Sequence, residues 1–192
     1  MSMHNTMSFE SADTEETVTC LNINVYHPQA TVFKSLNYTG KQKYRVEEMV
    51  MFGRDSKVCH FPLVDKRASR MQFAIQAFRH SESSELCFEI KNTSLKTKLF
   101  VNNASLDHLN KIDLPRKCIL RFGEYQFYLE KDDGESREHF EIFIKISLVP
   151  FCQEVNVETL THPVPEIGTV RITDVPIPRF QLAMECDENE IE

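Results

Sequence analysis

The sequence predicts an all-β protein, an antiparallel β-sandwich with a polar segment at each end. Three observations lead to this prediction. Short stretches alternate apolar and polar residues with a period of two, no stretch keeps a long helical period, and the large apolar residues include 14 Phe but no Trp. Alternation with a period of two is typical of strands that bury one face. About ten such strands indicate two sheets packed face to face.

Four stretches carry the alternation most clearly. They are residues 17–26, 71–78, 86–91 and 140–146. In the second of these, Phe73, Ile75 and Ala77 fall on one face of the strand. Shorter strands are expected at residues 49–52, 58–61, 98–101, 118–122 and 125–130. The β-branched and aromatic residues in these stretches suit a half-buried pleated surface.

The two ends of the chain differ from this pattern. Residues 1–16 hold four acidic residues and no Lys or Arg, so we expect a flexible acidic segment there. After Pro150 the periodicity stops, and five of the eight prolines lie between Pro150 and Pro178. Because proline cannot donate a hydrogen bond to a sheet, we expect residues 149–192 to form a disordered acidic tail outside the sandwich. The folded domain is therefore expected at residues 17–148.

Composition and motifs argue against several classes of protein. With 5 Gly in 192 residues and no glycine-rich phosphate-binding motif, a nucleotide-binding enzyme is not expected. No catalytic motif of the hydrolase, metalloprotease or kinase type occurs, and the six cysteines are spread without a zinc-like pair. We therefore expect neither an enzyme nor a metal or other cofactor. No apolar run is long enough to span a membrane and no signal sequence is visible, which favours a cytoplasmic protein.

The net charge of −7 argues against nucleic-acid binding, but it is unevenly distributed. Residues 1–16 carry −4 and residues 151–192 carry −7, whereas residues 17–150 carry +4. The expected sandwich is thus basic and lies between two acidic peptides. Such a body suits a phosphorylated acidic peptide at least as well as it suits nucleic acid.

The turns between the expected strands hold polar residues suited to phosphate binding. Arg54 offers a planar fork of N–H donors that matches phosphate oxygens, and Ser69 offers a hydroxyl. The Asn92 amide can hold a peptide backbone through one donor and one acceptor. Taken singly, each of them is more simply explained as a solvated surface residue or a turn former, and the same holds for Arg70.

In this order and on an all-β background, these residues resemble the forkhead-associated (FHA) domain family. That family shows Gly-Arg, then Ser-Arg-x-His, then Asn, and Gly53-Arg54, Ser69-Arg70 and Asn92 match it. The resemblance covers the expected domain and implies an FHA-like antiparallel sandwich of about eleven strands that binds phosphothreonine. It implies that Arg54 and Ser69 contact the phosphate, with Arg70 in the same recognition loop. It also implies that Lys91 and Asn92 border the phosphopeptide.

Further segments resemble a narrower group, the TRAF-interacting adaptors that carry an FHA domain. These segments are residues 12–20, 113–115, 121–127, 133–136 and 187–190. The resemblance implies that an alpha-kinase phosphorylates Thr14 during innate immune sensing and that the FHA domain of another copy then binds it. It implies further that a C-terminal acidic motif recruits a TRAF-family ubiquitin ligase toward NF-κB activation. The expected partners are a second copy of the chain, the kinase and the ligase, with no nucleic acid and no membrane.

The TRAF-binding motif is the less complete part of this resemblance. Its form is Pro-x-Glu-x-x followed by an acidic or aromatic residue, and Glu185 and Glu188 stand at the acidic positions. Ala183 replaces the proline, which removes some preorganisation of the extended peptide. A merely solubilising acidic tail is the alternative interpretation of this segment.

The position of Thr14 favours binding between molecules. It lies three residues before the first expected strand, a reach of about 10 Å at about 3.3 Å per residue. That strand is itself about 30 Å long, so recognition loops at its far end would be out of reach. Two alternatives stay open: a phosphothreonine reader for a different protein, and an FHA-like sandwich with a lapsed pocket that acts through constitutive dimer contacts. The second is kept open by Gln72, which stands where the FHA family has His.

Overall fold

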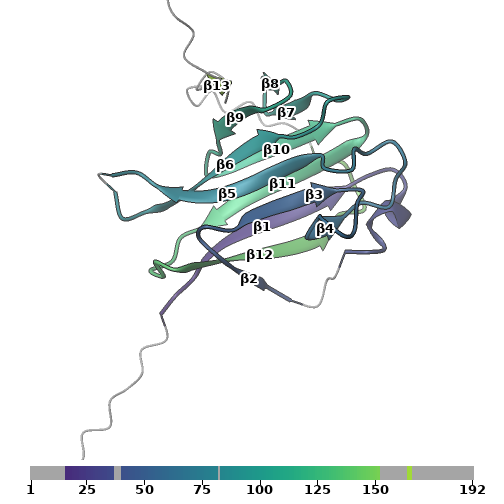
Figure 1. Cartoon of the computed structure of the whole chain (residues 1–192). Helices are drawn as coiled ribbons and strands as arrows, with labels where there is room; N and C mark the ends of the chain where they lie inside the picture. The colour runs from purple at the N-terminus through teal and green to yellow at the C-terminus, as the bar shows by residue number, and fades with distance from the viewer. Residues whose placement is uncertain (1–15, 37–39, 82, 152–163, 166–192) are drawn as a thin grey trace, which may run out of the picture.

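The computed structural model describes residues 16–36, 40–81, 83–151 and 164–165, which form two β-sheets packed face to face (Figure 1). The seven-stranded sheet has the spatial order β2 (Gln42–Arg45), β12 (His139–Ile146), β1 (Thr19–Tyr26), β11 (Tyr125–Asp132), β10 (Lys117–Phe122), β7 (Leu99–Val101) and β8 (Ala104–Leu106). The six-stranded sheet has the order β13 (Val164–Pro165), β9 (Asn110–Asp113), β6 (Leu86–Asn92), β5 (Phe73–Arg79), β3 (Met49–Gly53) and β4 (Phe61–Pro62). A short 3-10 helix, η1 (Ala30–Phe33), follows β1.

The all-β sandwich predicted from the sequence is confirmed. Most of its strand pairs are antiparallel, but β1 pairs with β12 and β3 pairs with β4 in parallel. Period-two alternation reports which face of a strand is buried and carries no information on its direction. The two parallel pairs therefore had no signal in the sequence.

The expected strand at residues 58–61 is largely a turn. The Val58 and Cys59 N–H groups both donate to the Asp55 carbonyl oxygen, at 3.2 and 2.8 Å, and only Phe61–Pro62 joins the sheet. Val58 is 50% exposed, so its apolar character does not mark a buried strand. Tyr44 and Ile112, in contrast, are buried on the short strands β2 and β9, which the sequence pattern did not reveal.

Aromatic side chains fill the core beneath one end of the sandwich. The Phe52 ring stacks on two others: its centroid lies 4.5 Å from that of Phe73 and 4.7 Å from that of Phe61. Phe127 packs edge-on against Phe73 at 5.4 Å, and all four side chains are fully buried. Stacked and edge-on pairs stabilise the core beyond the area they bury. Phe52 and Phe73 directly precede and follow the loops described below, so this cluster forms a rigid base for them.

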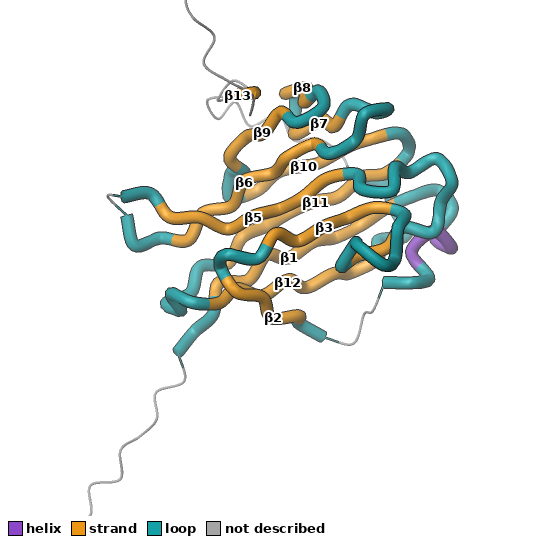
Figure 2. Tube along the Cα trace, in the orientation of Figure 1, coloured by secondary structure: helices purple, strands orange, loops and turns teal. Residues whose placement is uncertain are grey.

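The strand registers place three chain segments at this same end. Phe52 pairs with Phe73, and Phe73 pairs with Asn92, so β3 ends, β5 begins and β6 ends side by side. Figure 2 shows the loops gathered at the right-hand end of the sandwich, while the chain enters β1 from the lower left. The first strand therefore starts at the end opposite to these loops.

The sandwich extends slightly past the boundary expected at residue 148. The Phe151 N–H donates to the Gln126 Oε1 at 2.8 Å, and the Phe151 ring lies 5.9 Å from that of Tyr128. Val164–Pro165 pairs with β9 as a two-residue edge strand, a position where proline is tolerated because no N–H is required on its outer side. This short strand differs from the expectation that proline keeps the tail outside the sandwich. The rest of the expected tail, and the acidic segment before Glu16, lie outside the described residues.

Candidate functional site

The loops after β3 and before β5 are joined by backbone hydrogen bonds. The Gln72 N–H donates to the Phe52 carbonyl oxygen at 2.7 Å, and the Arg54 N–H donates to that of Ser69 at 2.8 Å. The two chains run so close that a Cβ atom on Gly53 would lie 2.4 Å from the Arg70 carbonyl oxygen. Only glycine fits there, because real Cβ atoms do not approach backbone atoms so closely. The Gly-Arg and Ser-Arg motifs, 16 residues apart in sequence, are thus brought into direct contact.

The two arginines of these motifs have exposed side chains at this junction. Arg54 and Arg70 are both exposed, and within the described residues neither guanidinium makes a side-chain hydrogen bond or ion pair. Their backbone, in contrast, is held firmly: the Cys59 thiol donates to the Arg70 carbonyl oxygen at 3.2 Å. Burial raises the pKa of the Cys59 thiol, which keeps it protonated and able to donate. Two guanidinium groups that are unpaired within the described residues and stand on a backbone held in place suit the binding of an anion.

A chain of hydroxyl groups continues the site from the β5 loop to the loop after β6. The Ser69 Oγ lies 2.7 Å from the Ser94 Oγ, which lies 2.9 Å from the Thr97 Oγ1. Gln72 is fully buried beneath them; its Oε1 accepts from the Ser69 N–H at 3.1 Å and its Nε2 donates to the Thr97 Oγ1 at 2.7 Å. Both ends of the Gln72 amide are therefore used to join the two loops.

Asn92 lies inside the protein rather than on the site surface. Its side chain is fully buried, and its Nδ2 donates to the carbonyl oxygens of Thr97 and Leu106 at 3.0 and 2.9 Å. Its Oδ1 accepts from the Ser94 N–H at 3.0 Å. The amide thus holds a peptide backbone, as its chemistry suggested, but that backbone belongs to the chain itself. Lys91, its strand neighbour, points to the opposite, partly exposed face of the sheet.

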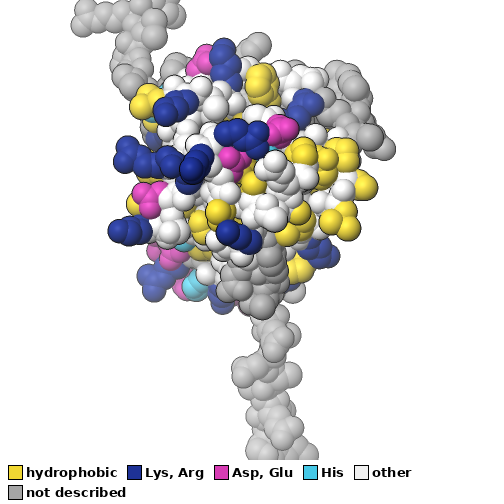
Figure 3. Space-filling model, turned by 90° about the vertical axis from the view of Figure 1, so that its right-hand side faces the viewer, with side chains coloured by type: hydrophobic (Ala, Val, Ile, Leu, Met, Phe, Trp, Pro, Cys, Tyr) yellow, Lys and Arg dark blue, Asp and Glu magenta, His cyan; other side chains and the backbone are white. Residues whose placement is uncertain are grey.

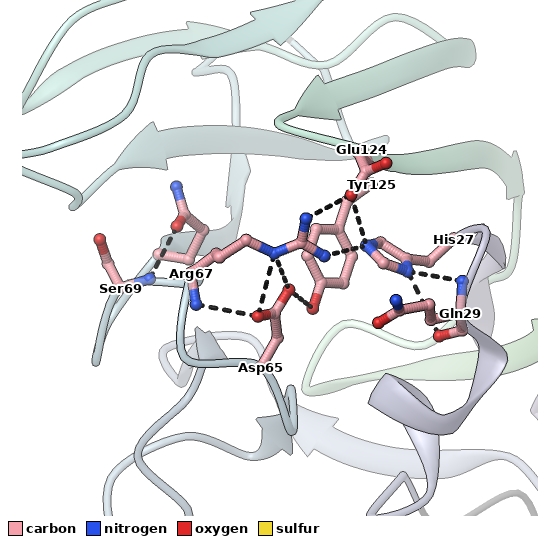
Figure 4. Close-up of polar contacts among 8 residues, drawn as sticks. His27, Gln29, Asp65, Arg67, Ser69, Glu124 and Tyr125 are labelled. Carbon is pink, nitrogen blue, oxygen red and sulfur yellow. Dashed lines mark hydrogen bonds and ion pairs between the residues drawn. The ribbon is translucent and has the colours of Figure 1, made fainter.

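A polar network fixes the loop before Ser69 to the other sheet (Figure 4). The Arg67 guanidinium forms ion pairs with Asp65 and with Glu124, and its Nη2 lies 3.3 Å from the buried His27 Nε2. The Tyr125 hydroxyl donates to the Asp65 Oδ2 at 3.1 Å. Burial favours a higher pKa for Asp65, but hydrogen bonds from Arg67 and Tyr125 outweigh it and leave that pKa below its usual value. Within the described residues, the Arg67 guanidinium is therefore already paired with carboxylates of the protein, in contrast to those of Arg54 and Arg70.

The sequence reasoning missed the contributions of Ser94, Thr97 and Gln72. Ser and Thr are common in turns, and nothing in the spacing of Ser94 and Thr97 distinguishes them from solvated loop residues. In the sequence, Gln72 stands out only because the FHA motif has His at that position. Its position three residues after Ser69, directly before a strand, is a signal that could have suggested a link back to the Ser69 backbone.

Figure 3 views the molecule from the right-hand side of Figure 1, the end that carries these loops. Lys and Arg side chains gather over the left half of this face, and hydrophobic side chains over the right half. Within the described part of the chain, no group of three or more His, Cys, Asp or Glu side chains is arranged to hold a metal ion. None of the helices described there is long and apolar enough to cross a membrane.

Comparison with known proteins agrees with this geometry. A family model of the FHA domain matches residues 50–123. Proteins named TRAF-interacting protein with FHA domain-containing protein A from Rattus norvegicus and Homo sapiens are 49% and 47% identical to the chain. These matches cover 96% and 95% of this chain and 99% and 98% of the relatives. The chain belongs to the family of TRAF-interacting proteins with an FHA domain.

More distant similarities are also found for this TRAF-interacting FHA protein. The Homo sapiens protein named TRAF-interacting protein with FHA domain-containing protein B is 24% identical over 75% of this chain and 88% of its own length. The solved FHA domain of the CT664 protein from Chlamydia trachomatis gives a TM-score of 0.41 at 15% identity, covering 57% of this chain and 95% of that one. Residues 50–123 include Arg54, Ser69, Arg70 and Asn92, so the residues that match the FHA motif fall within the matched domain.

Proposed function

We propose that the protein is a signalling adaptor whose FHA domain binds phosphorylated Thr14 of another copy. The observation that carries this proposal is the junction of Arg54 and Arg70 beside the Ser69 hydroxyl. Among the described residues, it presents two unpaired guanidinium groups and a hydroxyl on a backbone that hydrogen bonds hold in place. In this proposal Arg54, Ser69 and Arg70 bind the phosphate, and Lys91 borders the peptide. Asn92 acts by holding the loop that follows β6.

The phosphate supplies the charge that such a site needs. Phosphorylation of Thr14 would add about −1.5 to −2 charges and strong acceptor oxygens to an acidic segment. One hydrogen bond to a charged group contributes about 1.5–3 kcal/mol. The unmodified threonine, a neutral hydroxyl among acidic residues, offers little to either arginine. Binding is therefore conditional on phosphorylation.

The geometry of β1 supports binding between molecules. The ion pair between Arg67 and Glu124 places the site loops at the end of the sandwich where Tyr26 lies. Thr19 begins the same strand seven residues earlier, about 23 Å away at about 3.3 Å per residue. Thr14 stands five residues before Thr19, and five residues span at most about 18 Å. The phosphothreonine therefore cannot reach the site of its own chain, and a head-to-tail contact that does not close on itself propagates into larger assemblies.

The tail would couple assembly to a downstream partner. The relatives are named for TRAF interaction, and Glu185 and Glu188 supply the acidic positions of a TRAF-binding peptide. Such peptides bind as an added strand, and several copies in one assembly would bind with avidity. We therefore include recruitment of a TRAF-family ubiquitin ligase toward NF-κB activation in innate immunity. An alpha-kinase acts upstream, and the protein works in the cytoplasm without catalysis, cofactor, nucleic acid or membrane.

Light scattering on the full-length protein tests the proposal. Protein with and without phosphate on Thr14 is compared, each with Arg54 intact and with Arg54→Ala. We expect large species only for phosphorylated protein with Arg54 intact. An unchanged mass on phosphorylation would refute self-assembly and favour a reader of a different phosphoprotein. Equal association in all four samples would favour a constitutive dimer with a lapsed pocket.

The tail is tested separately by binding to a TRAF domain. Glu185→Ala should abolish binding of the assembled protein to an immobilised TRAF domain, while Glu192→Ala, a charge change outside the motif, should leave it unchanged. Full retention of binding by Glu185→Ala would place the TRAF contact elsewhere in the chain.

A further inference from the structure

A hollow of about 180 Å³ adjoins the phosphate-binding residues on the loop after β6. It is lined by Ser94, Leu95, Lys96, Thr97, Lys98, Asp107 and His108. Ser94 joins the hollow to the site, because its Oγ lies 2.7 Å from the Ser69 Oγ. A ligand whose phosphate reaches Ser69 therefore brings its neighbouring residues to the hollow.

The wall of this hollow is positively charged on balance. Within the described residues, the ammonium group of Lys96 has no recorded ion pair or hydrogen bond. Lys98 forms an ion pair with Asp107 at 3.1 Å, and both side chains are more than 60% exposed. Such an exposed pair is weak and can exchange partners with an incoming carboxylate. Counting only the residues that the structure describes, the hollow offers one unpaired cation and one exchangeable cation, opposed by one carboxylate.

The backbone of the hollow is organised in advance. The N–H groups of Lys96 and Thr97 both donate to the Ser94 Oγ, at 3.1 and 3.0 Å, and Asn92 holds the same loop from beneath. The His108 Nδ1 is buried in the wall and has no hydrogen-bond partner among the described residues. A site whose loop is already ordered loses little conformational entropy on binding.

The sequence around Thr14 supplies side chains that match this charge. Asp13, Glu15 and Glu16 lie one or two residues from Thr14. At about 3.3 Å per residue, these positions fall about 3–7 Å along the peptide from the phosphothreonine. The hollow begins at Ser94, whose Oγ lies 2.7 Å from the Ser69 Oγ, so its near edge is within this reach.

We propose that this hollow is an acidic-residue subsite, in which Lys96 and Lys98 bind a carboxylate one or two residues from the phosphothreonine. The subsite rests on the proposed function, since it needs a phosphate bound at Ser69 and Arg54. It makes the site selective for phosphothreonine in an acidic context. Asp107 limits the affinity, because it neutralises Lys98 and repels the incoming carboxylate.

Fluorescence anisotropy with labelled peptides of residues 8–20 tests this subsite. Three phosphorylated peptides are used: the native sequence, one with Asp13→Asn, and one with Glu15→Gln and Glu16→Gln. Each is titrated with the wild-type protein and with the Arg54→Ala, Lys96→Gln, Asp107→Asn and Lys43→Gln variants. Lys43 is a matched control, because it lies on β2 at the sheet edge opposite to β7 and β8.

For the native peptide, Lys96→Gln should weaken binding about two- to fivefold, the range of one exposed ion pair. Asp107→Asn should strengthen binding by a similar factor, and Lys43→Gln should leave it unchanged. One of the two neutralised peptides lacks the carboxylate that enters the hollow. That peptide should bind the wild-type protein more weakly than the native peptide does, and it should bind wild type and Lys96→Gln equally well. If it is the Asp13→Asn peptide, the residue before Thr14 enters the hollow; if it is the Glu15→Gln and Glu16→Gln peptide, the residues after Thr14 do.

Two different failures can be told apart. If no phosphopeptide binds, or if Arg54→Ala leaves binding unchanged, the proposed function itself is wrong. If the native phosphopeptide binds in an Arg54-dependent manner but neither neutralised peptide binds more weakly, the acidic-residue subsite is overturned. Weaker binding for Asp107→Asn would also overturn it.

Discussion

Replacement of Asn92 by alanine separates a loop-holding role from a ligand-binding role. The side chain makes three hydrogen bonds, to the carbonyl oxygens of Thr97 and Leu106 and from the N–H of Ser94. Asn92→Ala removes all three bonds, so two carbonyl groups and one N–H lose their Asn92 partner in a buried site. Water cannot enter freely, because Asn92 is fully buried.

The magnitude follows from these three bonds. A buried polar group that loses its partner costs about 1–3 kcal/mol. The bond to Thr97 is only partly buried, so water can replace some of it. We therefore expect Asn92→Ala to lower the free energy of unfolding by about 2–5 kcal/mol. With a urea m-value of about 1.5 kcal/mol/M, a loss of about 3 kcal/mol lowers the unfolding midpoint by about 2 M.

Urea unfolding followed by circular dichroism measures this loss. Lys96→Ala is the matched control, because Lys96 lies on the same loop with an exposed side chain. Its free energy of unfolding should differ from that of the wild type by less than about 0.5 kcal/mol. Binding of the Thr14 phosphopeptide is measured on the same samples under conditions where each remains folded. If Asn92→Ala keeps the wild-type midpoint and yet abolishes peptide binding, the loop-holding role is wrong and the amide contacts the ligand directly.

Three further predictions concern the backbone and the polar groups of the site. Gly53→Ala places a Cβ atom 2.4 Å from the Arg70 carbonyl oxygen. It should lower the free energy of unfolding, measured in urea, by about 1–3 kcal/mol. In anisotropy titrations it should also weaken phosphopeptide binding at least tenfold. Gln72→Leu, which keeps the volume but removes the amide, should destabilise by about 1–3 kcal/mol and weaken binding several-fold; unchanged binding would remove Gln72 from the site. The pKa of Asp65 is lowered in the folded protein, so its contribution to stability is fully present above the ordinary value of 3.8 and is lost as the pH falls through the lower folded value. Asp65→Asn should therefore lower the thermal midpoint at pH 7, and the difference from wild type should shrink toward pH 3; an equal difference at both pH values would contradict the assigned ion pair.

The longer strands could be predicted because each carries several buried residues in alternation. Phe73, Ile75 and Ala77 on β5 are all buried, and the expected and observed strands agree within two residues there. The short strands β2 and β9 each bury a single hydrophobic residue, Tyr44 and Ile112. One buried residue sets no period, so such strands are invisible to pattern arguments.

The site could be predicted only in part, for a related reason. Arg54, Ser69 and Arg70 are singled out by their order in the FHA-like motif, because each of them alone is also explained as a surface or turn residue. The role of Asn92 was harder to assign, since an amide binds a ligand backbone and its own backbone through the same two groups. Only its complete burial distinguishes the two roles. The ion pair between Arg67 and Glu124 joins residues 57 positions apart, and no local pattern reports such a contact.

Binding between molecules is the central claim, and mixing two half-defective variants tests it most directly. One variant carries phosphorylated Thr14 with Arg54→Ala, so it can donate the phosphothreonine but cannot bind one. The other carries Thr14→Ala with Arg54 intact, so it can bind a phosphothreonine but cannot donate one. By analytical ultracentrifugation, neither variant alone should form phosphorylation-dependent assemblies, whereas the mixture should form a complex containing both. If the mixture sediments as the sum of its separate components, capture of Thr14 by a second copy is contradicted.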